Sequence, residues 1–220
     1  MEKLIESALK MIEPKMTVSF GGGRTVGRLL RAVKDSQLDI KIASPSEATR
    51  DLCKELELPV TSLEEVTTFD LAFDGCDSLD HHLNALKSNG GIHVFEKLYA
   101  NLSKRYIILA PETRFTKVLN PDIQLTLEVL DLAMPQVIAA VEKLGGTAEI
   151  RQSSDIAGMV RTKNGNGLLD CHFDDWSYID EIDAELGSMV GVMGTSYFKD
   201  IVTDALLATD DGVKHVKKDI

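Results

Sequence analysis

The sequence predicts an α/β fold: a doubly wound, mostly parallel, Rossmann-like sheet with a small inserted α+β domain of the ferredoxin-like type. Two observations predict it. Short apolar runs alternate with segments of helical periodicity up to residue 121, as in parallel sheets. The order then becomes strand–helix–strand–strand–helix–strand, which is typical of a small α+β sandwich. We therefore expect a main domain over 1–121 and 196–220, and a small domain over 122–195.

The main domain is predicted to begin with a helix, because apolar residues recur at helical spacing up to Ile12 and the pattern stops before Pro14. The continuously apolar run 105–110 is typical of a central strand in a parallel sheet. The expected strands are 17–20, 38–44, 59–62, 69–75 and 105–110, with a last strand and an Asp-Gly turn in 204–218; the expected helices are 1–12, 26–34, 46–58 and 93–102.

The small domain is predicted from alternating and helical patterns in turn. A hairpin is expected around Asn164-Gly165, because Asn-Gly is a strong turn dipeptide. The other expected elements are strands at 123–130, 148–152 and 188–193 and helices at 135–146 and 178–186.

Composition limits the classes of partner. The chain of 220 residues carries a formal net charge of −11, and 44% of its residues are hydrophobic. The negative charge disfavours nucleic acid and anionic membranes as partners, because both need basic patches. It does not exclude small phosphorylated substrates, which backbone N–H groups can hold locally. No window approaches 18 consecutive apolar residues, so we expect no membrane-spanning helix.

The cysteines indicate a reducing compartment. Cys53, Cys76 and Cys171 are odd in number and scattered, with no CxxC pair. The segment 1–16 mixes charges throughout and lacks the apolar core of a signal peptide. We therefore expect a cytoplasmic protein, in which Cys76 is a small buried filler.

A glycine-rich loop follows the strand at 17–20 and opens the next helix. In this position backbone N–H groups point outward at the positive end of the helix dipole, which suits a phosphate. The run matches neither a dinucleotide-binding motif nor a Walker motif. By itself it fits a phosphate loop and a tight turn equally well. Its residues are Gly21, Gly22, Gly23, Arg24 and Thr25.

A second loop, ASPSEAT (43–49), again leads from a strand into a helix, and it contributes Ser44, Ser46 and Thr49. Alone, it fits best an ordinary helix N-cap at Ser46 with Glu47 in the first turn. Two such loops at the same end of one sheet favour ligand binding, because ligands bind outside the carboxyl ends of the strands in open α/β sheets.

The stretch LAFDGCDSLDHHLNALKSNGGIHVFEK (71–97) gathers three carboxylates and a lysine around a glycine turn. Asp74 and Asp77 fall at the end of a predicted strand, where neighbouring carboxylates raise each other's affinity for protons. Lys87 supplies a positive charge that can stabilise an oxyanion. Glu96 lies in a segment that otherwise packs, and a half-buried carboxylate with a raised pKa is a competent general base.

Each of these residues also has an ordinary interpretation. Asp74 can belong to a plain Asp-Gly turn, and Glu96 to a solvated helix face. Asp80, His81 and His82 could join the two aspartates as metal ligands, but the spacing does not match the tight alternating spacing of a hard-cation loop. We therefore predict neither a metal site nor a cofactor, and we expect the histidine pair at the surface.

The same stretch, D-G-C-D…K-S-N-G-G…E-K, resembles the D-G-A-D-E…K-G-G-G-G…R-E-K motif of the type A ribose-5-phosphate isomerase family. The separations match: the second aspartate lies three positions after the first, the lysine ten positions further on, and the glutamate nine positions after the lysine. VSFGGGRT and ASPSEAT resemble the family's G-x-G-T-G-S-T and T-S-x-x-T loops. KNGNGLLD (163–170) resembles its T-D-N-G-N-x-I-L-D hairpin, and TDDGVK (209–214) its G-x-D-G-V strand. Five matches in order identify the chain as a divergent member.

The resemblance implies an enzyme that interconverts D-ribose 5-phosphate and D-ribulose 5-phosphate, a step of the pentose phosphate pathway, through a cis-enediolate and without a metal. In this reaction Glu96 would move a proton between C2 and C1. Asp74 and Asp77 would assist ring opening and exchange protons with the sugar oxygens. Lys87 would hold the developing oxyanion.

The resemblance also implies where the substrate binds and how the chain assembles. Family members form dimers or tetramers, often through the smaller domain, so we expect a homodimer or homotetramer. The implied substrate-binding residues are the two loop sets (Gly21, Gly22, Gly23, Arg24, Thr25; Ser44, Ser46, Thr49) together with Gly90, Gly91 and Arg114.

The chain departs from the family motif at the substrate-binding end. Gly22 and Arg24 stand where the family has Thr and Ser, and Arg114 replaces a lysine. Ser88 and Asn89 replace glycines, which should stiffen the turn. These changes leave open an isomerase of a related sugar phosphate, or a sensor that binds a sugar phosphate without turnover. The four retained catalytic-type residues argue against the sensor, and the motifs fit deamination of an amino-sugar phosphate poorly.

Overall fold

The large sheet confirms the predicted α/β class. The computed structural model describes residues 1–218, so the last two residues of the predicted main domain lie outside the described part. Five strands of this sheet run parallel and only the last one, at the edge, is antiparallel. The order is β14-β13-β6-β3-β1-β2, with strands β1 (Thr17–Phe20), β2 (Lys41–Ala43), β3 (Leu71–Asp74), β6 (Tyr106–Pro111), β13 (Asp204–Ala208) and β14 (Val213–Lys217).

One predicted strand of this region is absent from the sheet. Residues 59–62 form only an isolated bridge, between Val60 and Ile42. Pro59 has no N–H to give to a ladder, and a single bond from Thr61 N to Ile42 O (2.7 Å) remains. The prediction of a strand at 59–62 was therefore wrong.

Helices cover both faces of the large sheet, as expected for a doubly wound fold. Adjacent strand residues alternate in direction: Phe73 and Ile107 pack with α1 and α2, whereas Ala72 and Ile108 pack with α4 on the other face. The helices are α1 (Glu2–Leu9), α2 (Arg24–Ser36), α3 (Glu47–Glu55) and α4 (His93–Asn101), with short 3₁₀ turns at Leu63–Glu65 (η1) and Glu112–Arg114 (η2).

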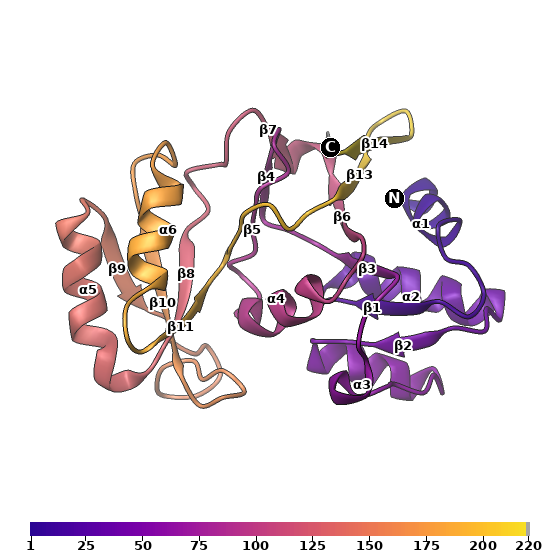
Figure 1. The fold of residues 1–220 in the computed structure, drawn as a ribbon, viewed down its shortest axis with the longest axis horizontal. Helices are drawn as coiled ribbons and strands as arrows, with labels where there is room; N and C mark the ends of the chain where they lie inside the picture. Colours follow the sequence, from indigo (N-terminus) through magenta and orange to yellow (C-terminus); the bar gives the residue numbers. More distant parts are fainter. Residues whose placement is uncertain (219–220) are drawn as a thin grey trace.

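The small sheet has the predicted ferredoxin-like order, β11-β8-β10-β9, and is antiparallel throughout. Its last strand starts four residues later than predicted, because the chain still turns at Gly191 (φ 96°). Figure 1 shows this sheet and its two helices beside the large sheet. The elements are β8 (Leu125–Val129), η3 (Asp131–Ala133), α5 (Met134–Lys143), β9 (Thr147–Ile150), β10 (Gly167–His172), α6 (Ile179–Gly187) and β11 (Val192–Thr195).

A third sheet, which the sequence did not predict, lies between the other two (Figure 1). Its order is β12-β5-β4-β7, with strands β4 (Ser78–Asp80), β5 (Ala85–Leu86), β7 (Phe115–Thr116) and β12 (Tyr197–Phe198). Strands of two or three residues are too short to show a period in the sequence. This sheet matters for the site, because Lys87 directly follows β5.

Two further expectations can be compared with the structure. Cys53, Cys76 and Cys171 are buried free thiols, as expected without a disulfide framework. Across residues 1–218, the structure contains no helix with the length and apolarity that a membrane crossing requires.

Candidate active site

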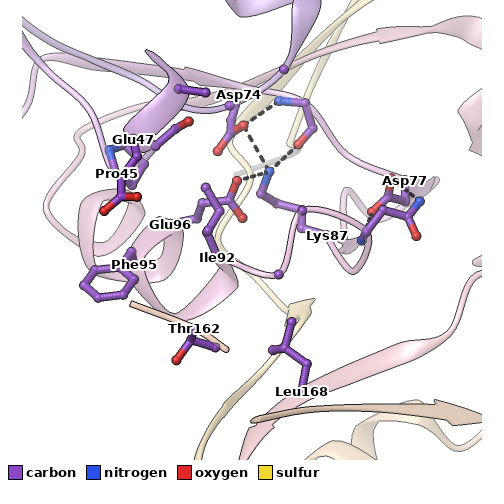
Figure 2. Close-up of a pocket in the computed structure, with 18 of the residues that line it drawn as sticks. Pro45, Glu47, Asp74, Asp77, Lys87, Ile92, Phe95, Glu96, Thr162 and Leu168 are labelled. Carbon is purple, nitrogen blue, oxygen red and sulfur yellow. Dashed lines mark hydrogen bonds and ion pairs between the residues drawn. The ribbon is translucent and has the colours of Figure 1, made fainter. Parts of the chain in front are cut away.

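Three charged side chains meet in the interior at the carboxyl end of β3 (Figure 2). Lys87 Nζ lies 3.1 Å from Asp74 Oδ1 and 3.2 Å from Glu96 Oε1, and it donates to the carbonyl of Gly75 at 2.5 Å. The exposed fractions of Asp74, Lys87 and Glu96 are 2%, 6% and 5%. One positive charge thus faces two carboxylates in a region closed to bulk water. We call these three residues the charged cluster.

Each member of the charged cluster comes from a different element. Asp74 ends β3 and accepts the N–H of Gly75 at 2.8 Å. Lys87 follows β5, and Glu96 lies in the first turn of α4, where the helix dipole favours negative charge. Tyr106, at the start of the neighbouring strand β6, donates its hydroxyl to Asp74 Oδ2 at 2.9 Å. Asp74 is therefore fixed through both carboxylate oxygens.

Burial and mutual charge set the protonation of the cluster. Burial, followed by the nearby charge of Asp74, raises the pKa of Glu96 to about 8, although Lys87 opposes both. Burial lowers the pKa of Lys87, but Asp74 and Glu96 outweigh it and the net shift is upward. Burial also raises the pKa of Tyr106, which remains a hydrogen-bond donor. A carboxyl group that can release and accept a proton near neutral pH therefore lies beside a fixed cation.

Asp77 lies outside the charged cluster. Its Oδ2 accepts the N–H groups of Ser88 (2.7 Å) and Asn89 (2.9 Å), and its Oδ1 accepts Asn89 Nδ2 at 2.9 Å. We expected Asp74 and Asp77 to perturb each other. The carboxylate whose pKa Asp74 helps to raise is that of Glu96, and both carboxylates lie against Lys87 in the buried cluster. Asp77 still lines the same cavity, at the side of the turn.

The charged cluster opens onto a cavity of about 700 Å³. Its walls come from the loops after β1 and β2, the turn after β5 and the first turn of α4. The opposite wall comes from the hairpin that leads into β10, including Thr162 and Leu168 (Figure 2). A site between two sheet units is a common position for a small-molecule ligand.

The glycine loop contributes backbone to this cavity. Gly22 and Gly23 line it at the start of α2, where the first N–H groups have no partner within the helix. Gly21 instead packs against the charged cluster, since a Cβ there would lie 2.1 Å from Asp74 Cγ. The predicted contacts of Arg24 and Thr25 with the cavity are not seen: neither residue lines it, and Arg24 is exposed on α2.

The second loop contributes one of its three predicted side chains. Ser46 lines the cavity and caps α3 by accepting Thr49 N at 3.3 Å. Ser44 and Thr49 do not line it. Ser44 Oγ accepts Ser46 N (3.1 Å), and Thr49 Oγ1 donates to Gly21 O (2.7 Å). The Thr49 hydroxyl therefore joins the two loops and the Ser44 hydroxyl braces the second one, which leaves the backbone at the start of α3 to face the cavity.

The remaining predicted substrate-binding residues lie at the cavity. Gly90 and Gly91 line it, and Gly91 takes a left-handed conformation (φ 66°) that favours glycine. Arg114 lines it as well and donates to the carbonyl of Cys76. Burial raises the pKa of the Cys76 thiol to about 12, which fits the expected buried filler.

Comparisons with known proteins show the family to which the chain belongs. The model of the family described as ribose 5-phosphate isomerase A (phosphoriboisomerase A) matches residues 41–212. The chain belongs to this family. It is 31% identical to ribose-5-phosphate isomerase A of Thermococcus kodakarensis over 218 residues, which is 97% of this chain and 95% of that protein.

Solved structures of family members have the same fold. Ribose 5-phosphate isomerase A from Methanocaldococcus jannaschii is 28% identical, with a TM-score of 0.91 over 98% of this chain and 97% of that one. A D-ribose-5-phosphate isomerase in complex with phospho-erythronic acid is 27% identical, with a TM-score of 0.93 over 98% and 96% of the two chains.

Sequence reasoning missed several residues of the site, and three of them matter for its geometry. Tyr106 holds Asp74, and Phe198 stacks on Tyr106 (centroids 6.0 Å apart) with its ring 5.7 Å from Lys87 Nζ. Arg151 lines the cavity from the end of β9. A tyrosine at the head of an apolar strand and an arginine after a short strand carry no motif of their own. No local signal identifies them.

The histidine pair lies at the surface, as expected. His81 and His82 are exposed, and Asp80 Oδ1 accepts the N–H groups of His82 and Asn84, both at 2.8 Å. Asp80 therefore closes the β4–β5 turn. Among residues 1–218 there is no group of three or more His, Cys, Asp or Glu side chains arranged to hold a metal ion.

Proposed function

We propose that this protein interconverts D-ribose 5-phosphate and D-ribulose 5-phosphate through a cis-enediolate. The observation that carries the proposal is the charged cluster at the cavity. It offers a base with a pKa near neutrality, Glu96, beside a buried cation, Lys87. Membership of the ribose 5-phosphate isomerase A family supports the same reaction.

In the proposed mechanism Glu96, as the carboxylate, removes the C2 proton of the open-chain aldose and then returns it to C1. The C2 hydroxyl proton moves to O1 by way of Asp74. The negative charge that develops on the enediolate oxygens faces the ammonium of Lys87, which stabilises it in a site shielded from water. Asp77, at the side of the cavity, assists ring opening.

We propose that the phosphate binds at the start of α2 and α3. Gly22, Gly23 and Ser46 line the cavity there, and the N–H groups of both helix ends suit an anion. The related enzyme in complex with phospho-erythronic acid supports this class of ligand, because that compound combines a phosphate with a planar carboxylate resembling an enediolate.

The test is an isomerisation assay of the wild type and Glu96→Gln with ribose 5-phosphate. We expect ketose formation by the wild type, solvent deuterium at C1 or C2 of recovered sugar, and a loss of about 10²–10⁴-fold in kcat for the variant. Glu112→Gln, on an exposed glutamate outside the cavity, is the matched control. No wild-type turnover alongside thermal stabilisation by ribose 5-phosphate would favour the sensor, and turnover of another sugar phosphate alone would favour a related isomerase.

We further propose that residues 1–121 and 196–220 form the catalytic domain, that 122–195 form a small domain, and that two or four copies associate through it. Four exposed apolar side chains on this part support the association: Leu130, Leu132, Val190 and Met193, with exposed fractions of 46%, 92%, 96% and 51%. Light scattering after gel filtration measures the mass of the assembly.

We also propose a cytoplasmic location. The buried free thiols support it, because free thiols are typical of a reducing compartment.

A further inference from the structure

The turn formed by residues 88–91 is held on one side by Asp77. This turn follows Lys87 directly, so its position decides where the lysine side chain begins. The Asp77 carboxylate accepts hydrogen bonds from the N–H groups of Ser88 and Asn89 and from the side-chain amide of Asn89. These three bonds fix the donors of the turn and leave its carbonyl groups to other partners.

The carbonyl side of the turn is held by Arg151, which comes from the small sheet. Arg151 Nη2 donates to Ser88 O at 2.9 Å, and Nη1 donates to Asn89 O at 3.2 Å. Gly91 rests on the same surface, since a Cβ there would lie 2.6 Å from Leu168 Cδ1 and 3.3 Å from Arg151 Nη1. Two carbonyls of one turn thus meet one planar guanidinium, a geometry that a lysine cannot reproduce.

Arg151 is itself oriented by Asp170 on β10. Its Nε lies 2.8 Å from Asp170 Oδ2 and its Nη2 lies 2.5 Å from Asp170 Oδ1. Thr126 on β8 donates to Asp170 Oδ1 at 2.6 Å and accepts from Arg151 Nη2 at 3.0 Å. The side chains of Arg151 and Asp170 are 17% and 15% exposed. A two-point Arg–carboxylate pair of this kind restricts the guanidinium to one plane.

We propose that Arg151 is a positioning residue for the isomerisation: aligned by Asp170, it holds the 88–91 turn so that Lys87 stays between Asp74 and Glu96. The catalytic part of this inference rests on the proposed function. The small sheet then contributes to the geometry of the reaction as well as to one wall of the cavity. Misplacement of a reacting group by about 1 Å can cost about 100-fold in rate.

The decisive variant is Arg151→Met, which keeps much of the side-chain length and removes the fork of donors. We expect kcat to fall by about 10- to 100-fold, as for other misplaced groups, with KM changed by less than about threefold. Arg151→Lys should recover little, because a single ammonium cannot bind Asp170 and both carbonyls. Asp170→Asn should show a smaller loss of the same kind.

A pH profile provides a readout that general loosening of the fold would not move. Asp74 on β3, Lys87 after β5 and Tyr106 on β6 face Glu96, and Lys87 is the one that lowers its pKa. If Lys87 moves away in Arg151→Met, the acidic limb of kcat/KM should shift to higher pH. Arg105→Met is the matched control. Arg105 makes a similar two-point pair with Asp204, outside the cavity, so its loss should lower the Tm without moving kcat or the profile.

Hydrogen exchange tests the inference without turnover. The N–H groups of Ser88 and Asn89 should exchange faster in Arg151→Met than in the wild type or Arg105→Met. Unchanged exchange of these N–H groups would overturn the proposal, whether or not the wild type is active. An inactive wild type on ribose 5-phosphate would count only against the proposed function. A rise in KM at constant kcat that Arg151→Lys reverses would show direct substrate binding instead. A lower Tm with unchanged kinetics would reduce Arg151 to a structural residue.

Discussion

The charged cluster and the two loops after β1 and β2 line the same cavity, but they present different parts of the chain to it. In the charged cluster the side chains face the cavity, and Asp74 and Lys87 are each held by at least two partners in the interior. In the loops the side chains of Ser44 and Thr49 turn back onto the protein, and Arg24 is exposed. What the loops offer to a ligand is mainly backbone N–H.

This difference explains where the chain departs from its family. A side chain that moves protons cannot be exchanged without loss of the reaction, and the sequence matches the family motif at all four residues for which the resemblance implies a catalytic role. A backbone N–H is supplied by every residue except proline, so Gly22 and Arg24 can replace Thr and Ser while the helix ends keep their donors. The comparison predicts that substitutions in the charged cluster change the kinetics strongly, whereas substitutions of exposed loop side chains change them little.

After Glu96→Gln, the largest effect is expected from Lys87→Met. Removal of the ammonium leaves Asp74 and Glu96 facing each other with no cation and removes the group that stabilises the oxyanion. We expect kcat to fall by about 10²–10³-fold, the usual loss for one oxyanion partner. Steady-state kinetics measure it, with circular dichroism to verify folding. A variant that retains kcat within a few-fold would remove Lys87 from the mechanism.

Gly21→Ala should give the next largest effect, through Asp74. The new methyl group would overlap the Asp74 carboxylate, which must then leave Lys87. We expect kcat to fall by about tenfold or more, and the free energy of unfolding to fall by about 1–3 kcal/mol, a loss typical of overpacking. Gly22→Ala is the control in the adjacent position, where a Cβ meets Ser46 Oγ at an ordinary 3.6 Å. It should affect KM more than kcat, and equal effects of the two variants would contradict the packing argument.

The pH dependence of kcat/KM should show a single acidic limb near pH 8. Because the pKa of Glu96 is raised to about 8, its carboxylate is scarce below that pH and activity rises as pH increases through it. Burial lowers the pKa of Lys97 to about 8 as well, so the assignment needs Lys97→Met, which should leave the limb in place. A limb near pH 4–5 would show that Glu96 titrates like a solvated glutamate.

The smallest effect is expected from Arg24→Ala. Arg24 is exposed at the start of α2 and does not line the cavity. We expect KM for ribose 5-phosphate to change by about twofold or less, since exposed substitutions usually change free energies by about 0.5 kcal/mol or less. An increase of tenfold would show that the guanidinium reaches the phosphate, and the contrast between loops and cluster would then weaken.

Much of the fold could be predicted because most of its longer strands and helices have a recognisable pattern of apolar residues or turn residues in the sequence. The apolar run at 105–110 predicted β6, the Asn-Gly dipeptide predicted the turn before β10, and the change of element order marked the ferredoxin-like part. The third sheet was out of reach, because its strands have two or three residues and are paired by contacts distant in sequence, such as Phe198 with Ala85. The strand expected at 59–62 is absent because Pro59 has no N–H to donate to a neighbouring strand, which the pattern of apolar residues does not take into account.

The site was predictable to the extent that its chemistry is local. Spacing in one stretch led to Asp74, Lys87 and Glu96, and the structure brings them together. The partner of Asp74 was misjudged, because sequence proximity favoured Asp77 whereas α4 brings Glu96 to the same lysine. Tyr106 and Arg151 act across strands and sheets. Their roles depend on the tertiary structure, and their positions in the sequence give no sign of it.

The buried thiol of Cys76 has a practical consequence. It lies between the two aspartates of the motif, is 4% exposed, and has its pKa raised to about 12. At physiological pH it is neutral and covered, so an alkylating reagent can reach it only when this part of the chain opens. The rate of Cys76 alkylation in the resting protein would therefore measure how often the catalytic centre opens. The measurement needs neither substrate nor an engineered label.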